Sequence, residues 1–294
     1  DATNSKLILL PVPWEATASY GTGTSLAPEA ILKASHQLDL FDLQLGEPYK
    51  KGIYMDTETE SILTYNNKCT KLIQNSRTNP DIIKEINSIS TKINLLVEKK
   101  ADFYIKQNKL VGVVGGEHSS PFGLIKALSK KHSSFGILHF DAHLDLRDSY
   151  EELTWSHASI MFNVVEKIPE VSKIVHVGIR DFCYPELQKV QKESKKLSLW
   201  SDDKIFREKA SGNSFAKIAE KIINELPHLV YVSFDIDGLE PNNCPHTGTP
   251  VPGGFSFQEA CYLIENLAMK KEIIGFDLCE VCPSENNTKL DENI

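Results

Sequence analysis

The sequence predicts an α/β fold with a mainly parallel sheet that helices cover on both faces. The first observation is a series of short apolar runs, typical of buried strands, at 7–11, 110–114, 135–140, 173–179, 229–234 and 273–278. The second is that helical patterns lie between most of these runs. Strands that alternate with helices favour a parallel sheet, because a parallel pair needs a crossover connection, which is usually a helix.

Periodicity identifies the helices that are easiest to read. Apolar residues repeat with the 3.6-residue period of a helix at 82–97 and again at 215–226. Residues 47–80 are polar and show no such clear pattern, and we expect a surface excursion with one helix there.

Two further helices are predicted from signals at their N-termini. Pro121 follows two serines, which predicts a helix that begins there with the proline in its first turn. Ser256 and Glu259 have the spacing of a capping box, in which each side chain bonds the other residue's backbone N–H. We expect the helix that this box opens to run through Leu267.

Length, composition and charge describe an ordinary globular protein. The 294 residues are 41% hydrophobic and 24% charged, which allows an ample core, and we expect a single domain over 1–294. The net charge of −8 argues against a nucleic-acid partner and is compatible with a cationic substrate. No apolar run approaches the length of a membrane span, and the N-terminus lacks a signal-peptide pattern.

The six cysteines are scattered along the chain, as in reduced cytoplasmic proteins, and we expect that location. Cys279 and Cys282 have the spacing of a zinc or redox pair. If the strand that begins at 273 continues through both, their sulfurs lie on opposite faces and too far apart for a disulfide. No second cysteine pair supplies the other half of a zinc site, so we expect these two residues to be structural.

Two segments carry ionisable side chains at every second residue directly after an apolar run. One contains Asp141, His143 and Asp145, and the other contains Asp235 and Asp237. Residues two apart in a strand point to the same face, so each set would converge. Crowded like charges repel one another and lose hydration, and a pair of divalent cations would resolve that conflict. The alternative is two solvated turns that happen to be acidic.

Further polar residues follow other strands at the same predicted edge, where ligands bind in open α/β sheets. His118 comes after a turn at Gly115 and Gly116, and Glu280 follows the run at 273–278. The candidate metal ligands are His118, Asp141, His143, Asp145, Asp235 and Asp237. Nitrogen and oxygen ligands of this kind suit Mn²⁺ or a similar first-row ion. Four carboxylates balance two divalent ions, which would share a bridging hydroxide as the nucleophile of a hydrolase.

Several segments resemble the signatures of the ureohydrolase family, which includes arginase, agmatinase and formimidoylglutamase. The matching stretches are 115–119, 141–145, 233–241, 247–254 and 276–281. The resemblance extends around them, from about Pro11 to Pro283. It implies a three-layer α/β/α fold of the arginase type. It also implies a dimanganese site that hydrolyses guanidino compounds to an amine and urea.

The resemblance assigns a role to each candidate ligand. Two carboxylates would bridge both ions, namely Asp141 and Asp235. Each ion would have two further ligands, His118 with Asp145 for one and His143 with Asp237 for the other. Nickel, cobalt or iron in place of manganese stays open.

The substrate-side residues are carried over in the same way. Glu280 would bind the guanidinium, with an exposed acid at a strand end as the alternative. His157 would contact the substrate and transfer a proton to the departing amine, with a structural histidine as the alternative. Asp145 would share a proton with the bridging hydroxide, and Thr249 would line the substrate mouth or serve only in a turn. We read His139 as a buried, hydrogen-bonded histidine.

The chain resembles bacterial agmatinases more than arginases. Arginases hold the amino-acid end of their substrate with asparagines in a stretch that corresponds to 146–156, and this stretch contains none. The segments 17–24 and 28–31 also resemble the agmatinase branch. The acids at 148, 151 and 152 favour a dication such as agmatine, although a solvated loop is the simpler reading. We therefore predict hydrolysis of agmatine to putrescine and urea, a reaction of polyamine biosynthesis.

Other readings stay open. The substrate alternatives are those of arginase, guanidinobutyrase and formimidoylglutamase. A non-catalytic metal-binding relative and a binuclear phosphoester hydrolase are further alternatives, although the latter usually needs basic clamps and Arg147 is weak evidence for one. Relatives form trimers or hexamers, so we expect a homo-oligomer. Family members continue past Glu280 into a further helix, whereas this sequence stops at Ile294, so we expect that helix to be missing.

Overall fold

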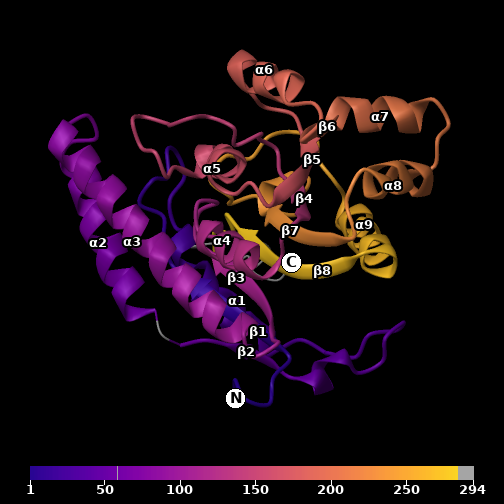
Figure 1. Ribbon diagram of the computed structural model, residues 1–294, viewed down its shortest axis with the longest axis horizontal. Helices are drawn as coiled ribbons and strands as arrows, with labels where there is room; N and C mark the ends of the chain where they lie inside the picture. Colours follow the sequence, from indigo (N-terminus) through magenta and orange to yellow (C-terminus); the bar gives the residue numbers. More distant parts are fainter. Residues whose placement is uncertain (58, 284–294) are drawn as a thin grey trace.

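The computed structural model describes residues 1–57 and 59–283 (Figure 1). The helix expected to be missing concerns 284–294, which lies outside the described residues. Within them, eight strands form one sheet in the order β2-β1-β3-β8-β7-β4-β5-β6, and all paired strands are parallel. The strands are β1 (Leu7–Val12), β2 (Ile53–Met55), β3 (Leu110–Gly115), β4 (Phe135–Phe140), β5 (Val171–Ile179), β6 (Leu197–Ser201), β7 (Leu229–Asp235) and β8 (Glu272–Cys279). The predicted α/β class with a mainly parallel sheet is confirmed.

Helices pack on both faces of the sheet and produce three layers (Figure 1). One buried cluster joins α2, α3, α4, α5 and α6 to one face, and a second joins α1, α7, α8 and α9 to the other. The helices of the described chain are α1 (Ala27–Ser35), α2 (Glu60–Asn75), α3 (Pro80–Ile105), α4 (Phe122–Lys131), α5 (Ile160–Lys167), α6 (Tyr184–Lys192), α7 (Asp202–Ala210), α8 (Phe215–Asn224) and α9 (Phe257–Lys270). None of them is both long and apolar enough to cross a membrane.

All six strands predicted from apolar runs are present, and two more strands were missed. Both missed strands lie at the edges of the sheet, β2 beside β1 and β6 beside β5. The strand β2 has only three residues, and Ile53 in it is 54% exposed. It lies in 47–80, so the expectation of a surface excursion with one helix was incomplete. An edge strand is half-buried at most, so its sequence lacks the continuous apolar run that marks a central strand.

The helix signals were close to the observed boundaries. In α9, Ser256 Oγ accepts from the N–H of Glu259 and Glu259 Oε2 accepts from the N–H of Ser256, both at 3.2 Å, so the capping box is confirmed. The helix α4 begins at Phe122 with Pro121 at its N-cap, so the proline precedes the first turn rather than lying in it. The pattern at 82–97 is the centre of the longer helix α3.

The strand β8 ends at Cys279 and does not continue to Cys282, so the condition under which the geometry would exclude a disulfide is not met. The chain turns at Glu280, which has a positive φ of 62°. Cys279 is nevertheless a free thiol and is fully buried, and Cys282 Sγ donates to the backbone oxygen of Thr22 at 3.4 Å.

Candidate metal centre

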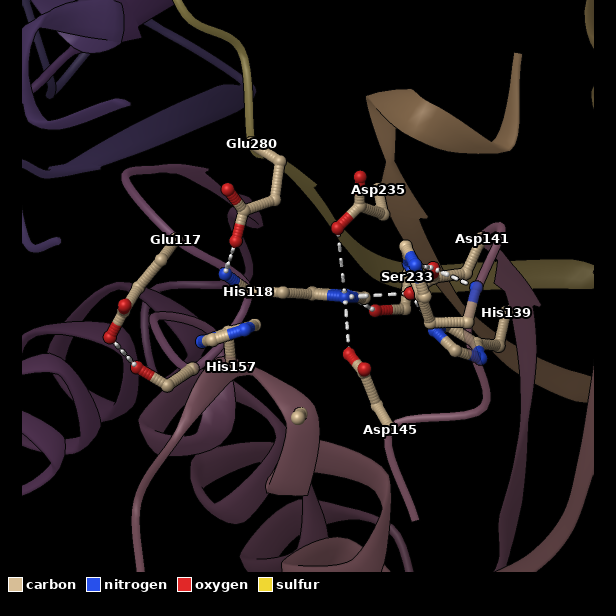
Figure 2. Close-up of polar contacts among 12 residues, drawn as sticks. Glu117, His118, His139, Asp141, Asp145, His157, Ser233, Asp235 and Glu280 are labelled. Carbon is tan, nitrogen blue, oxygen red and sulfur yellow. Dashed lines mark hydrogen bonds and ion pairs between the residues drawn. The ribbon is translucent and has the colours of Figure 1, made fainter. Parts of the chain in front are cut away.

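The candidate ligands and Glu280 lie at the carboxyl ends of four strands that are neighbours in the sheet, β3, β8, β7 and β4. His118 follows β3, and Glu280 follows β8 directly. The segment 141–145 follows β4, whereas Asp235 ends β7 and Asp237 lies in the short 3₁₀ helix η4 (Ile236–Gly238). Because parallel strands present their carboxyl ends at one edge, residues far apart in sequence meet here, as Figure 2 shows.

One group of side chains converges on the ring of His118. Its Nδ1 atom lies 3.1 Å from Asp141 Oδ2, 3.1 Å from Asp145 Oδ2 and 3.4 Å from Asp235 Oδ2. Figure 2 shows the His118 side chain pointing between Asp145 and Asp235. All four residues are buried, with Asp145 the most exposed of them at 5%.

A second group converges on the ring of His143. Its Nδ1 atom lies 3.1 Å from Asp237 Oδ2 and 3.4 Å from Asp141 Oδ1. Asp141 therefore belongs to both groups and offers a different oxygen to each, Oδ2 to the first and Oδ1 to the second. Two overlapping sets of residues offer ligand atoms close enough to hold metal ions, one of His118, His139, Asp141 and Asp145 and the other of Asp141, His143 and Asp237. Asp141 is common to both sets, and the predicted ligand Asp235 belongs to neither.

Backbone amides orient three of the carboxylates. Asp237 Oδ1 accepts from the N–H of Ala142 at 2.9 Å, and Asp235 Oδ1 accepts from the N–H of Asp237 at 2.9 Å. Asp141 Oδ1 accepts from the N–H of His143 at 2.6 Å. In Asp235 and Asp237 the second oxygen is left to face an imidazole, so the fold points these oxygens into the cluster before any ligand arrives.

The donor set fits divalent cations. Four buried carboxylates share the site, and in the part of the chain that the structure describes their ion pairs are with histidines rather than with lysine or arginine. Buried carboxylates without a balancing cation are costly, because burial removes their hydration. Two imidazoles and four carboxylates match the nitrogen and oxygen preferences of first-row ions.

The neighbouring carboxylates raise the pKa values of both histidines in the cluster. Burial opposes the charged form of His118, but its bonds to Asp141 and Asp145 prevail and raise its pKa well above the usual value. Burial also opposes the charged form of His143, and there the charges of Asp237 and Asp141 raise the pKa to about 12. Without cations, protons therefore supply positive charge to the site.

The carboxylates divide between ionised and protonated forms. Burial and the charge of Asp237 raise the pKa of Asp235 well above its usual value. Burial and the charge of Asp141 raise the pKa of Asp145 to about 6. Burial acts in the same direction on Asp141, but its bonds to His118 and His139 outweigh it and hold the pKa of Asp141 well below the usual range.

A serine and an aspartate behind His118 fix which of its nitrogens faces the cluster. His118 Nε2 lies 2.9 Å from Ser233 Oγ, which in turn donates to Asp277 Oδ2 at 2.9 Å. Because the Ser233 hydroxyl donates its hydrogen to Asp277, its oxygen accepts from the N–H at His118 Nε2. Neutral His118 therefore has its lone pair at Nδ1. Sequence reasoning missed this role of Asp277, although an acid within the apolar run of β8 was a signal for it.

Two histidines lie behind Asp141. His139 Nε2 is 2.9 Å from Asp141 Oδ2, and His139 Nδ1 is 2.8 Å from His176 Nδ1. Both rings are fully buried, so the reading of His139 as a buried, hydrogen-bonded histidine is confirmed. Burial and the neighbouring His139 hold the pKa of His176 well below its usual value, so its ring is neutral. His176 was not singled out from the sequence, because its apolar strand resembles any other core strand.

The residues expected on the substrate side lie beside this cluster. Glu280 Oε1 accepts from the N–H of His118 at 2.9 Å, and burial, reinforced by Glu117, raises the pKa of Glu280 well above its usual value. Gly248, the residue before Thr249, lies next to Glu280, because a Cβ built on it would be 3.5 Å from Glu280 Oε2. Thr249 itself is partly exposed.

His157 begins the 3₁₀ helix η3 (His157–Ser159), and loop residues hold both of its ring nitrogens. Its Nδ1 atom lies 3.1 Å from the backbone oxygen of Thr17, and its Nε2 atom lies 3.3 Å from Ser19 Oγ. Burial, with the nearby charge of His143, lowers the pKa of His157 to about 4. The ring is therefore neutral near pH 7.

Two charged residues considered from the sequence have other partners. Glu151 forms an ion pair with Arg77, which also donates to the backbone oxygen of Ala18. Arg147 lies over the ring of Tyr150 at 4.8 Å, and its Nε atom is 3.8 Å from Glu186 Oε2. These contacts give Arg147 a structural setting and weaken its reading as a phosphate clamp.

Comparison with known proteins agrees with the fold and the motifs. The model of the arginase family matches residues 5–292. N(1)-aminopropylagmatine ureohydrolase of Thermus thermophilus is 29% identical over 95% of this chain and 84% of its own length. Agmatinase of Pyrococcus horikoshii is 28% identical over 96% of this chain and 85% of its own length.

Solved structures share the fold at low sequence identity. The agmatine ureohydrolase of Thermoplasma volcanium superimposes with a TM-score of 0.75 at 24% identity, over 100% of this chain and 88% of that one. Arginase from Medicago truncatula gives a TM-score of 0.73 at 23% identity, over 99% and 84% of the two chains. The expected arginase-like fold and the resemblance to the ureohydrolases are both confirmed. With a family match across nearly its whole length, the chain belongs to the arginase family of hydrolases.

Proposed function

We propose that this chain is a binuclear metal hydrolase that cleaves a guanidino compound to an amine and urea. The observation that carries the proposal is the position of Asp141, whose two oxygens face two different ligand groups. A carboxylate in this position suits a bridge between two cations. The proposal treats 1–294 as one catalytic domain of a cytoplasmic homo-oligomer, a trimer or hexamer, as the family resemblance implies.

The roles of five ligands follow the two groups, whereas the bridging role of Asp235 rests on the family resemblance. We assign His118 and Asp145 to one cation and His143 and Asp237 to the other, with Asp141 and Asp235 as bridges. The oxygen-rich donor set supports Mn²⁺, with other first-row divalent ions as alternatives. When bound, such a pair lowers the pKa of a shared water to near neutrality and so supplies the nucleophile.

Glu280 is assigned to the substrate guanidinium. Its Oε1 atom is held by the N–H of His118, which places the carboxyl next to a metal ligand while Oε2 faces Gly248. A planar guanidinium pairs well with a carboxylate and favours its ionised form, which offsets the burial that otherwise keeps Glu280 protonated. Thr249, next to Gly248, is assigned to the mouth through which the substrate would enter.

His157 is assigned to proton transfer. His157 Nδ1 lies 3.1 Å from the backbone oxygen of Thr17, which only accepts, and 3.3 Å from Ser156 Oγ, which can accept as well, so we place the ring proton at Nδ1. The neutral ring then has its lone pair at Nε2, where it accepts a proton and passes it to the departing amine. Asp145, which lies beside His118 in the first group, is assigned to sharing a proton with the attacking water, as the family resemblance implies.

The substrate class is a guanidino amine without a carboxylate, and we propose agmatine, which would give putrescine and urea. The arginines nearest the site already have partners, Arg77 with Glu151 and Arg180 with backbone oxygens that include that of Asp237. Asp181 is exposed and its carboxylate is 3.9 Å from His143 Nε2. These features favour a cationic tail. The N1-aminopropyl derivative of agmatine is the second candidate, since several relatives are named for it.

A substrate panel tests this choice. Urea release should be fastest with agmatine in a set that also contains N1-aminopropylagmatine, arginine, guanidinobutyrate and formiminoglutamate. We expect kcat/KM for the carboxylate-bearing compounds to be lower by about tenfold or more, because Arg77 and Arg180, in the described part of the site, already have partners. Faster turnover of N1-aminopropylagmatine selects the second candidate, and faster turnover of any carboxylate-bearing compound rejects the substrate class.

Replacing Glu280 by glutamine should separate substrate binding from metal binding. The amide oxygen still accepts from the N–H of His118, but the charge that pairs with the guanidinium is lost. We expect kcat/KM to fall by roughly 30-fold or more, equivalent to about 2 kcal/mol, with metal content unchanged. Glu272→Gln, at the exposed start of the same strand, is the matched control. Equal kcat/KM for both variants would remove Glu280 from the substrate site.

Metal binding should release protons. His118 and His143 are protonated in the metal-free cluster near pH 7, because their pKa values are raised, and each must lose a proton to act as a ligand. We expect release of about two or more protons per chain when Mn²⁺ is added at about pH 7. Calorimetry in buffers of different ionisation enthalpy measures this number. Binding with no dependence on the buffer contradicts the assigned ligands.

A further inference from the structure

Glu117 lies between two functional segments but is not itself a candidate ligand. It precedes His118 in the turn after β3, and its side chain is fully buried. Its Oε1 atom accepts from the hydroxyl of Thr17 at 2.5 Å and from that of Ser119 at 2.8 Å, while Oε2 accepts from the N–H of Thr17 at 3.1 Å. Both carboxylate oxygens therefore hold Thr17.

Thr17 in turn contacts His157 through two of its atoms. Its backbone oxygen lies 3.1 Å from His157 Nδ1, and its hydroxyl oxygen accepts from the N–H of His157 at 3.3 Å. Thr17 is 1% exposed, so water does not compete for these bonds. The Thr17 hydroxyl donates to Glu117 and accepts from His157, and it thus joins the two residues directly.

The loop that carries Thr17 is fastened to the same turn at a second point. The N–H of Glu117 donates to the backbone oxygen of Trp14 at 2.8 Å. A Cβ built on Gly116 would lie 1.9 Å from that oxygen, so only glycine allows the two backbones to approach so closely. The turn that presents His118 to the cluster is therefore also the anchor of the loop that touches His157.

We propose that Glu117 and Thr17 are positioning residues that set the tautomer and orientation of His157. We call the hydrogen bonds between Glu117 and Thr17 the clamp. The clamp holds the backbone oxygen of Thr17 against His157 Nδ1, which keeps a proton on that nitrogen and leaves the lone pair at Nε2. This inference rests on the role proposed for His157. It adds a connection from the ligand turn at 116–118 to the proton-transfer residue, so that one backbone element sets the position of both.

Thr17→Val tests the clamp with little change of shape. It removes the bond to Glu117 Oε1 and the bond from the N–H of His157. We expect kcat to fall roughly tenfold to a hundredfold with KM and metal content nearly unchanged, because a displaced proton-transfer group slows chemistry more than binding. Thr17→Ser keeps the hydroxyl and should recover kcat to within about threefold of the natural chain.

Thr24→Val is the matched control. Thr24 is also buried and lies in the same N-terminal stretch, and within the described residues its hydroxyl has no hydrogen-bond partner. We expect this variant to keep the natural kcat. If Thr17→Val behaves like Thr24→Val, or if Thr17→Ser fails to recover activity, the clamp does not position His157.

A second measurement does not depend on turnover. Nitrogen NMR of the ¹⁵N-labelled full chain, loaded with diamagnetic Zn²⁺, reports which ring nitrogen of His157 carries the proton. We expect the Nδ1–H form in the natural chain and in Thr17→Ser, and a growing share of the Nε2–H form in Thr17→Val. An Nε2–H form in the natural chain overturns the clamp. If the chain is inert on every substrate but this result is as expected, the clamp holds and the proposed function fails.

Discussion

The burial of several carboxylates at one edge of a parallel sheet is the constraint on which the rest of the structure depends. Asp141, Asp235 and Asp237 are each at most 4% exposed, and among the described residues they form ion pairs with histidines but with no lysine or arginine. Such a cluster repels itself and has lost its hydration. The raised pKa values of His118 and Asp235 reflect this crowding of carboxylates, which divalent cations would relieve.

Hydrogen bonds from the surrounding residues orient the ligand atoms of the cluster. Backbone N–H groups donate to one oxygen of Asp235 and to one oxygen of Asp237. Ser233, which donates to Asp277, forms a hydrogen bond with one ring nitrogen of His118. The atoms that remain face the cluster. Binding a cation then requires little rearrangement, because the orientation of the ligands is already fixed by the fold. The same turn that carries His118 also anchors the loop that contacts His157.

The sequence was most informative where chemistry and strand periodicity coincide. Central strands read as apolar runs, and charged residues directly after them predicted the sheet edge where the candidate ligands meet. The edge strands β2 and β6 were not predicted, because half-buried strands lack such apolar runs. The residues that orient the ligands and His157 were not predicted for another reason. Asp277, His176 and Thr17 act through contacts across strands or loops, and their partners are 37 or more residues away. Spacing along the chain does not encode these contacts.

The central claim is that Asp141 joins two cation sites in one cluster. Its most direct test is the Mn²⁺ content of the full chain together with its electron paramagnetic resonance spectrum. The account predicts about two Mn²⁺ per chain with the spectrum of a spin-coupled pair, since one carboxylate would bridge both ions. A single Mn²⁺ per chain, or two ions without spin coupling, would contradict it.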